Sequence, residues 1–350
     1  PSSPYRKGSR VRAKIEQARE ELAGFFSFKR DQIIFTSGAT EANNAIFAHF
    51  SKGLGVKGSC LVSPFEHPSV IDSAKYWFDQ KIIYMPTDGK GLVNLNETSS
   101  ILEKEKISLV SLMAANNETG VLQPWQELAE VCSRNGVYFH CDATQWVGKL
   151  DTSGLSNCGS FSASAHKFCG PKGVGWLATK APVKMQLGGA QEFGLRGGTE
   201  NYPAIASMMV AFNDAQDRIS EVNSRALWRG EFDKGIVAGS PNSQILGSGK
   251  KRLWNTSMVL LPDYENLRWV GKLDKLGFEV STGSACSVGK EQGSGIANHY
   301  GLTAGQGRRL VRVSSYFEHS QSDWENLLSA FCLAYKELRS DSVNSSVLLL

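Results

Sequence analysis

The sequence lacks a long apolar segment. None of its uninterrupted hydrophobic runs approaches the roughly 18 residues that a membrane-spanning helix needs, and we expect no secretory signal at its start. The net charge is only +4, and the lysines and arginines are spread along the chain rather than gathered in a tail. These absences exclude an integral membrane protein and argue against direct binding of nucleic acid.

Cysteines are few, and their spacing fits neither metal ligands nor a disulfide framework. The chain has seven, an odd number, and no two of them form a CxxC pair. This spacing excludes a zinc knuckle, and we expect no metal site. A reducing compartment such as the cytoplasm is the expected location.

The remaining composition is typical of a globular protein that is large enough for two domains. The chain has 350 residues, of which 41% are hydrophobic and 21% are charged. Its first half alternates between helical patterns and strand-like runs, which we expect at residues 31–36, 60–63, 82–85, 107–115 and 137–141. This alternation predicts an α/β fold with a large, mostly parallel sheet.

Polar residues follow the ends of several expected strands. They are Ser37 to Thr40, His67, Asn117 and Asp142 to Gln145. Ligands bind at the carboxyl ends of the strands in open α/β sheets, so we expect the site at that edge.

A long helical pattern from Pro203 to about Val222 predicts the passage into a second domain. After it, expected strands at 254–261, 277–281 and 310–314 alternate with expected helices at 264–276 and 321–338. We therefore divide the chain into a large domain, residues 1–222, and a smaller C-terminal α/β domain, residues 223–350.

Lys167 is the most informative charged residue. It lies in the stretch FSASAHKFCGPKGVGWL (161–177), between two strand-like runs and beside small residues. Such a lysine is readily desolvated, and desolvation favours the neutral amine that can form an imine with a carbonyl group. On this stretch alone, an ordinary surface lysine in a hairpin turn is an equally good interpretation.

Two other segments supply what a pyridoxal phosphate site would need besides an imine-forming lysine. The turn from Ser37 to Thr40 lies between a strand and a helix, where backbone N–H groups and hydroxyls can bind phosphate, although Ser and Thr also cap helices without a ligand. Asp142 ends a buried strand and could pair with a pyridinium nitrogen. Its alternative role is to cap the following segment.

Several stretches together resemble one family, the cysteine desulfurases of the class V aminotransferase group, in their NifS/IscS-like branch. The matching stretches, in family order, are FTSGATEANNAI (35–46), EHPSV (66–70), NNETGVLQP (116–124), HCDATQWVGK (140–149), SASAHKFCGPKGVG (162–175), LRGGTEN (195–201), STGSACS (281–287) and RVS (312–314). The resemblance implies a fold-type-I PLP-dependent transferase, a homodimer, and conversion of L-cysteine to L-alanine with a persulfide left on the enzyme. The sulfur would pass to an acceptor or scaffold protein, for iron–sulfur cluster assembly or another pathway.

The resemblance also implies a role for individual residues. Lys167 would hold pyridoxal 5'-phosphate and move the Cα proton, Asp142 would pair with the ring nitrogen, and His67 would stack on the ring and assist proton transfer. The other implied contacts are to the phosphate for Thr40, Ser164, His166 and, from the second subunit, Thr199; to the ring oxygen for Gln145; and to the substrate carboxylate for Asn117 and Arg312.

Cys286 is the expected nucleophile. It lies in the small-residue loop STGSACS, which can expose and move a thiol, whereas a structural cysteine such as Cys332 lies within an apolar run. A thiolate there could attack the sulfur of the bound cysteine and carry the persulfide.

The sequence also departs from the family pattern. An expected first strand is missing ahead of Pro1, and Tyr5 stands where the family commonly has a histidine. Cys169 follows the lysine, and Ser315 and Tyr316 replace a usual Leu-Gly pair. The missing strand would affect stability or the completeness of the substrate entrance. The departures at Cys169 and at Ser315 and Tyr316 concern substrate preference and not the type of reaction.

Three alternatives remain open. A selenocysteine lyase or a direct cysteine C–S lyase would use the same cofactor, and the loop with Cys286 favours the persulfide route over both. A silent scaffold for sulfur-relay partners would lack catalysis altogether, against which the set Lys167, Asp142, His67 and Cys286 argues. The acceptor, the pathway and the rate are not encoded in these patterns.

Overall fold

The computed structural model describes the chain except residues 2, 4, 53–57, 284–294 and 348–350. The described chain divides into two compact units. The first comprises residues 1–87, 93–115 and 123–219, and the second comprises residues 88–92, 116–122 and 220–350. None of the helices in these described parts combines the length and hydrophobicity that crossing a membrane requires.

The first unit is built on a seven-stranded sheet with the strand order β1-β7-β6-β5-β4-β2-β3. All strands run in one direction except β7, which is antiparallel to both of its neighbours. The strands are β1 (Ile33–Thr36), β2 (Ser59–Val62), β3 (Ile82–Tyr84), β4 (Ile107–Ser111), β5 (Tyr138–Asp142), β6 (Ser160–Ser164) and β7 (Gly175–Thr179). This arrangement confirms the expected large, mostly parallel sheet.

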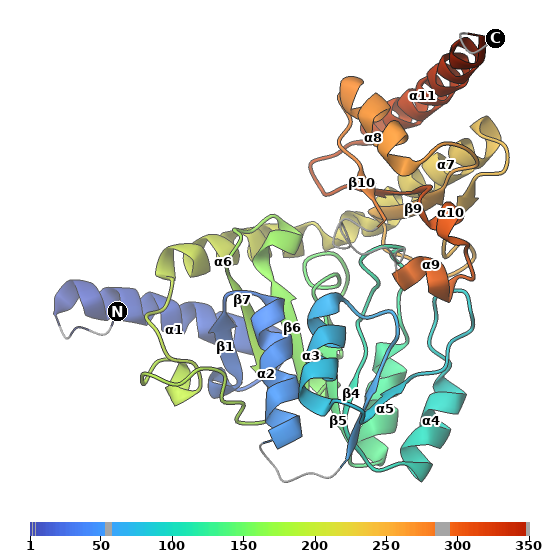
Figure 1. Cartoon of the computed structure of the whole chain (residues 1–350). Coiled ribbons are helices and arrows are strands. Elements are labelled where there is room, and N and C mark those ends of the chain that lie inside the picture. The colour runs from blue at the N-terminus through green and yellow to red at the C-terminus, as the bar shows by residue number, and fades with distance from the viewer. Residues whose placement is uncertain (2, 4, 53–57, 284–294, 348–350) are drawn as a thin grey trace. The chain divides into compact units, whose positions relative to one another are not determined.

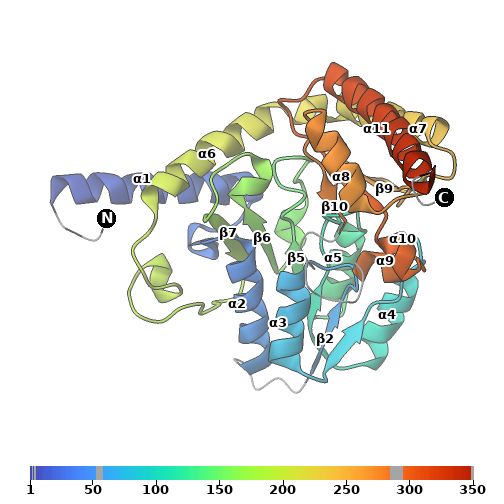
Figure 2. The same ribbon diagram turned by 45° about the horizontal axis from the view of Figure 1, so that its top comes forward.

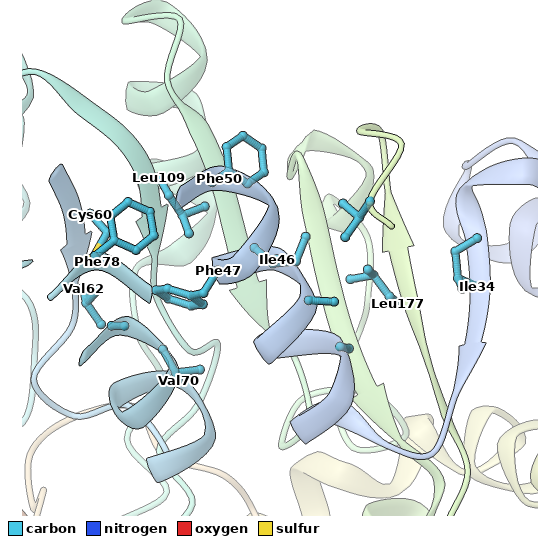
Figure 3. Packing of buried hydrophobic residues seen from close by; sticks show 14 residues of the cluster. Ile34, Ile46, Phe47, Phe50, Cys60, Val62, Val70, Phe78, Leu109 and Leu177 are labelled. Atoms are coloured by element: carbon cyan, nitrogen blue, oxygen red, sulfur yellow. The ribbon is translucent and has the colours of Figure 1, made fainter. Parts of the chain in front are cut away.

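Helices α2 (Ala39–Lys52) and α3 (Pro68–Phe78) lie side by side on one face of this sheet (Figures 1 and 2). Figure 3 shows Ile46 and Phe47 of α2 against the strand side chains Val62 and Leu177, all of them fully buried. Each such side chain contributes roughly 1.5–3 kcal/mol through burial. This core fixes α2 firmly on the strands.

The opposite face of the sheet carries an aromatic layer under α1 (Arg6–Phe26) and α6 (Tyr202–Asp217). Trp176 follows the alternation of a strand and points away from the neighbouring Leu177. Its ring lies 5.9 Å from that of Phe26 and 6.0 Å from that of Phe212. The two remaining long helices of this unit are α4 (Leu95–Lys104) and α5 (Trp125–Arg134).

The second unit has a four-stranded antiparallel sheet of order β10-β11-β9-β8. Its strands are β8 (Gln244–Ile245), β9 (Thr256–Leu260), β10 (Ser281–Thr282) and β11 (Leu310–Ser314). Trp269 and Phe331 belong to its core, and its helices are α7 (Val222–Gly239), α8 (Asn266–Lys275), α9 (Gly295–His299), α10 (Ala304–Gly307) and α11 (Gln321–Val347).

The predicted bounds of two elements after residue 202 are wrong. The helix expected from Pro203 to about Val222 ends at Asp217, and a short 3-10 turn, Ile219–Glu221, separates it from α7. The strand expected at 277–281 is limited to Ser281 and Thr282, because Gly277, at φ 85°, forms a turn after α8. The helices α9 and α10 were not expected.

Candidate active site

Polar residues gather at one edge of the first unit's sheet. Ser37 follows β1, His67 follows β2, Asp142 ends β5, and Ser164 ends β6. These four strands run in the same direction, so their carboxyl ends meet at the same edge. Asn117, the other polar residue expected there, belongs to the second unit and is described within it.

Asp142 is a buried carboxylate, only 5% exposed. The backbone N–H of Thr144 donates to its Oδ1 at 3.0 Å, and the side-chain amide of Asn43 donates to its Oδ2 at 2.9 Å. A carboxylate has about four acceptor positions, so these two hydrogen bonds leave it able to accept more. Both of these donors are uncharged.

His67 is oriented by the helix that follows it. It is the N-cap of α3, where its Nδ1 accepts the backbone N–H of Ser69 at 3.1 Å and lies 2.9 Å from the Ser69 hydroxyl. The proton of the neutral ring is therefore on Nε2. Burial lowers the pKa of His67, and Lys167 lowers it further, while Asp142 acts in the opposite direction.

Lys167 lies in a 3-10 turn, Ala165–Phe168, between β6 and β7. The turn closes tightly: Cys169 adopts a left-handed conformation at φ 61°, and the N–H of Gly170 donates to the carbonyl of Ala165 at 2.9 Å. A side chain at position 170 would come within 2.8 Å of the Ala165 Cβ. Lys167 is therefore half-buried in a short helical turn, and the Gly/Pro-rich segment that follows closes this turn. The connection is not a simple hairpin turn.

His166 is exposed next to this lysine. Partial burial lowers its pKa, and the charges of Lys167, Lys172 and Lys149 lower it further. These three cations make the surroundings of His166 electropositive, which favours binding of an anion.

Ser164 connects this turn to the beginning of α2. Its buried hydroxyl accepts the backbone N–H of Ala39, the first residue of the helix, at 2.7 Å. Gly38 has φ +151°, and a Cβ there would lie 3.2 Å from the Ser164 oxygen. Thr40 is exposed in the first turn of α2, where the helix dipole attracts negative charge.

Gln145 is held by a residue that the sequence reasoning did not single out. Lys149 is buried, and its Nζ donates to the Oε1 of Gln145. Gln145 keeps its amide N–H groups as donors for other partners.

Thr199 is exposed in the segment that follows the expected strands of the sheet. It lines a polar cavity of about 190 Å³ together with Ser37 and Arg196. Arg196 anchors the segment through its Nε, which lies 2.9 Å from Glu41 Oε1 near the start of α2. The expected contact of Thr199 with a second subunit stays a prediction.

Asn117 and Arg312 come together within the second unit. Nη1 of Arg312, on β11, donates to the backbone carbonyl of Asn117 at 3.0 Å. Its Nε is buried and has no hydrogen-bond partner among the described residues. The guanidinium thus keeps donors for a planar anion. Cys286 lies outside the described residues.

Three buried polar residues around Asp142 were inside the matched stretches but had no predicted role. They are Asn43, Glu66 and His140. Burial, together with the charge of Asp142, raises the pKa of the Glu66 carboxyl well above its ordinary value. Ser111 donates to Glu66 Oε1 at 3.3 Å. The available signal was sequence adjacency, since Glu66 precedes His67 and His140 lies two residues before Asp142.

A profile of the family described as aminotransferase class-V matches residues 2–327. The chain belongs to this family. The chain is 32% identical to the cysteine desulfurase IscS of Clostridium botulinum (strain Hall), over 98% of this chain and 88% of the relative. The family predicted from the motifs is confirmed.

Solved structures agree with this assignment. The chain is similar to a NifS-like protein, with a TM-score of 0.86 and 28% identity over 96% of this chain and 91% of the other. It is also similar to SspA in complex with cysteine, with a TM-score of 0.77 and 27% identity over 90% of each chain. The predicted fold-type-I architecture is confirmed.

Members of this family depend on pyridoxal 5'-phosphate, and the residues present fit that group. The cofactor has an anionic phosphate and a cationic ring nitrogen. The hydroxyls of Ser164 and Thr40 and the start of α2 suit the anion, and the incompletely bonded carboxylate of Asp142 suits the cation. Gly38 has no side chain, whereas a Cβ at this position would press on Ser164. The glycine therefore keeps the approach to Ser164 open.

Proposed function

We propose that the chain is a pyridoxal-phosphate-dependent cysteine desulfurase. L-cysteine and the thiol of Cys286 give L-alanine and a persulfide on Cys286: the C–S bond of the substrate breaks, an S–S bond forms, and a proton takes the place of sulfur on carbon. The observation that carries this proposal is that a carboxylate, Asp142, and an amine, Lys167, both lie near the imidazole of His67. The charges of Asp142 and Lys167 both act on the His67 ring.

The cofactor's place in this proposal follows from the donor set. Lys167 would hold it covalently, Asp142 would pair with its ring nitrogen, and Gln145 would donate to its ring oxygen. Thr40, Ser164 and His166 would bind its phosphate, with Thr199 contributed by the second subunit of a homodimer. When bound, the cofactor supplies an electron sink for the carbon atoms of the substrate.

The chain's own residues then move protons and sulfur. The ε-amine of Lys167 would take and return the proton at Cα of the substrate. His67 has Nδ1 engaged by Ser69, so its Nε2 would be the atom that exchanges protons. Asn117 and Arg312 would hold the substrate carboxylate, to which the guanidinium offers a planar pair of donors.

The name of the Clostridium botulinum relative and the cysteine in the SspA structure support L-cysteine as the substrate. The sulfur acceptor would be a protein, and the IscS-type relatives favour iron–sulfur cluster assembly as the pathway.

The decisive experiment measures alanine formed from L-cysteine in the presence of pyridoxal phosphate and a thiol reductant. The wild type is expected to form alanine, Cys286→Ala is expected to lose it, and Cys332→Ala, in the middle of α11, is expected to behave as the wild type. Alanine production that is equal in the wild type and Cys286→Ala would contradict the nucleophile assignment and favour a direct lyase.

Two further outcomes separate the alternatives. Faster turnover of L-selenocysteine than of L-cysteine would favour a selenocysteine lyase. A wild-type protein that binds no cofactor and forms no product would support the silent scaffold.

A further inference from the structure

Asn43 is a fully buried residue of α2 whose side chain touches the expected cofactor partner Asp142. Its Nδ2 donates to Asp142 Oδ2 and to Ser69 Oγ, each at 2.9 Å. Its Oδ1 lies 2.9 Å from His140 Nε2 and accepts the Ser162 hydroxyl at 2.7 Å. The amide therefore uses two donors and two acceptor positions and connects α2, α3, β5 and β6.

The orientation of this amide is fixed by its partners. A carboxylate can only accept, so the N–H group of Asn43, and not its oxygen, faces Asp142. The oxygen must then face His140, which places a proton on His140 Nε2 and leaves Nδ1 to accept from Ser160 at 2.9 Å. Burial lowers the pKa of His140 to about 4, which makes the ring neutral at physiological pH.

Asn43 also lies on the helix that serves the other end of the site. It lies about one turn after Ala39 and Thr40, a rise of about 4.5–6 Å along the helix axis. The N–H of Ala39 is fixed to Ser164, and Asn43 is fixed to Asp142. The spacing between the anion-binding and cation-binding ends is therefore set by one rigid element.

We propose that Asn43 is a positioning residue that holds the carboxylate of Asp142 in the orientation needed for the ring nitrogen of the cofactor. This inference rests on the proposed function. Asn43 acts through Asp142 and does not touch the reacting atoms.

The other ionisable groups around Asp142 do not replace this hydrogen bond. Glu66 has a raised pKa because it is buried beside Asp142, and Ser111 donates to it. His67 is directed by Ser69. Asn43 donates to Asp142 through its side chain, and Thr144 donates through its backbone.

The test compares Asn43→Ala with Asn43→Asp in the whole chain. Asp keeps the shape and the oxygen that faces His140, but it presents an oxygen to Asp142 where Asn presents an N–H. Loss of a hydrogen bond to a charged group should raise the dissociation constant of pyridoxal phosphate about ten- to a hundredfold in both variants. The pH titration of the bound cofactor's absorption should shift in both.

Tyr138→Phe is the matched control. Tyr138 begins β5, the strand that ends at Asp142, and its hydroxyl donates to the carbonyl of Gly159 at 2.6 Å. The variant therefore loses a partly buried hydrogen bond away from Asp142. It should bind the cofactor as the wild type does. If Asn43→Asp also binds as the wild type, or if Tyr138→Phe weakens binding equally, the positioning role is overturned.

A measurement on the cofactor-free protein tests the hydrogen-bond network itself, without relying on cofactor binding or activity. Nitrogen NMR of His140 should show the neutral ring with the proton on Nε2 in the wild type and a changed tautomer balance in Asn43→Ala; an unchanged ring would overturn the proposed network. Normal cofactor binding by a wild type that forms no alanine would contradict the substrate assignment and leave the Asn43 result intact. A wild type that binds no cofactor would overturn both.

Discussion

Two buried carboxylates of the first unit, Glu192 and Asp142, are almost equally shielded from water, at 4% and 5% exposure. Glu192 is paired with the buried guanidinium of Arg19 in a two-pronged contact of 2.6 and 2.8 Å. Asp142 receives its hydrogen bonds from the uncharged groups of Asn43 and Thr144. The chain therefore neutralises one negative charge itself and only orients the other.

The surroundings of Glu192 show what full neutralisation accomplishes. Its Oε2 also accepts the backbone N–H of Phe35 on β1 at 2.9 Å, and Arg19 on α1 donates to the carbonyl of Ile33 at 2.6 Å. Glu192 and Phe193 both have left-handed backbone angles, φ 48° and 60°, a conformation that costs about 1 kcal/mol or more per residue. The ion pair thus fastens a strained segment and a helix to the sheet.

This difference separates a structural carboxylate from one suited to a ligand. Glu192 has a cation and a backbone donor, so nothing is gained from a further cation. Asp142 accepts its hydrogen bonds from Asn43 and Thr144, which are uncharged donors, and a pyridinium nitrogen could pair with the same carboxylate. Glu66 is a third case: its burial and the charge of Asp142 raise its pKa, which favours the protonated form.

The largest expected effect comes from breaking the Arg19–Glu192 pair. Arg19→Met leaves Glu192 buried and uncompensated, which should lower the free energy of unfolding by about 3–5 kcal/mol. Urea denaturation of the whole chain measures it. Arg30→Met is the control, because Arg30 is half-exposed and lies 3.5 Å from Glu20, so its loss should cost no more than about 1 kcal/mol.

The double variant Arg19→Met with Glu192→Leu refines this result. It replaces both charges by apolar groups, and most of the lost stability should return. If the double variant is as unstable as Arg19→Met, packing of the guanidinium on the Phe35 and Phe193 rings, 4.8 and 5.0 Å away, is the larger contribution.

In contrast to Arg19→Met, Asp142→Asn should have a large effect on the reaction rate and a smaller one on the free energy of unfolding. Removing the charge opposite the cofactor's ring nitrogen should lower kcat by about a hundred- to a thousandfold. The loss in unfolding free energy should be smaller than for Arg19→Met, because no buried cation is left unpaired. Alanine formation and urea denaturation on the same preparations test this. Comparable activity in Asp142→Asn and the wild type would contradict the assigned role.

Much of the sheet could be predicted from the sequence because its strands are short apolar runs ended by polar or glycine residues. The strand Leu310–Ser314 matches its expected bounds, since its periodicity is clear. The break between α6 and α7 was missed, because nothing near Arg218 signals a helix end as Pro or Gly does.

Site residues could be predicted where the residue type and its position after a strand indicate a role. They could not be predicted where the role depends on a partner that only folding brings close. His67, Asp142 and Ser164 follow strands, so the parallel sheet brings them to one edge. Asn43 and Arg19 are ordinary helix residues in the sequence. Their roles depend on partners 99 and 173 positions away, Asp142 and Glu192, which local patterns cannot identify.

Glu66→Gln should change the free energy of unfolding least. The dependence of this change on pH distinguishes the variant from Arg19→Met and Asp142→Asn. Burial raises the pKa of Glu66, so above the ordinary glutamate pKa the folded wild type binds a proton that the unfolded chain has lost. Wild-type stability therefore falls as pH rises from that ordinary value towards the folded-state pKa. Gln is isosteric and has no proton to lose.

The stability of Glu66→Gln relative to the wild type should thus increase with pH, by up to about 1.4 kcal/mol per pH unit. Urea denaturation at a series of pH values measures this slope, and Glu103→Gln, exposed on α4, should give a flat difference. A flat difference for Glu66→Gln as well would mean that Glu66 is ionised in the folded protein. Asp142 would then face a second buried negative charge, and the contrast with Glu192 would have to be explained by an additional cation at this edge of the sheet.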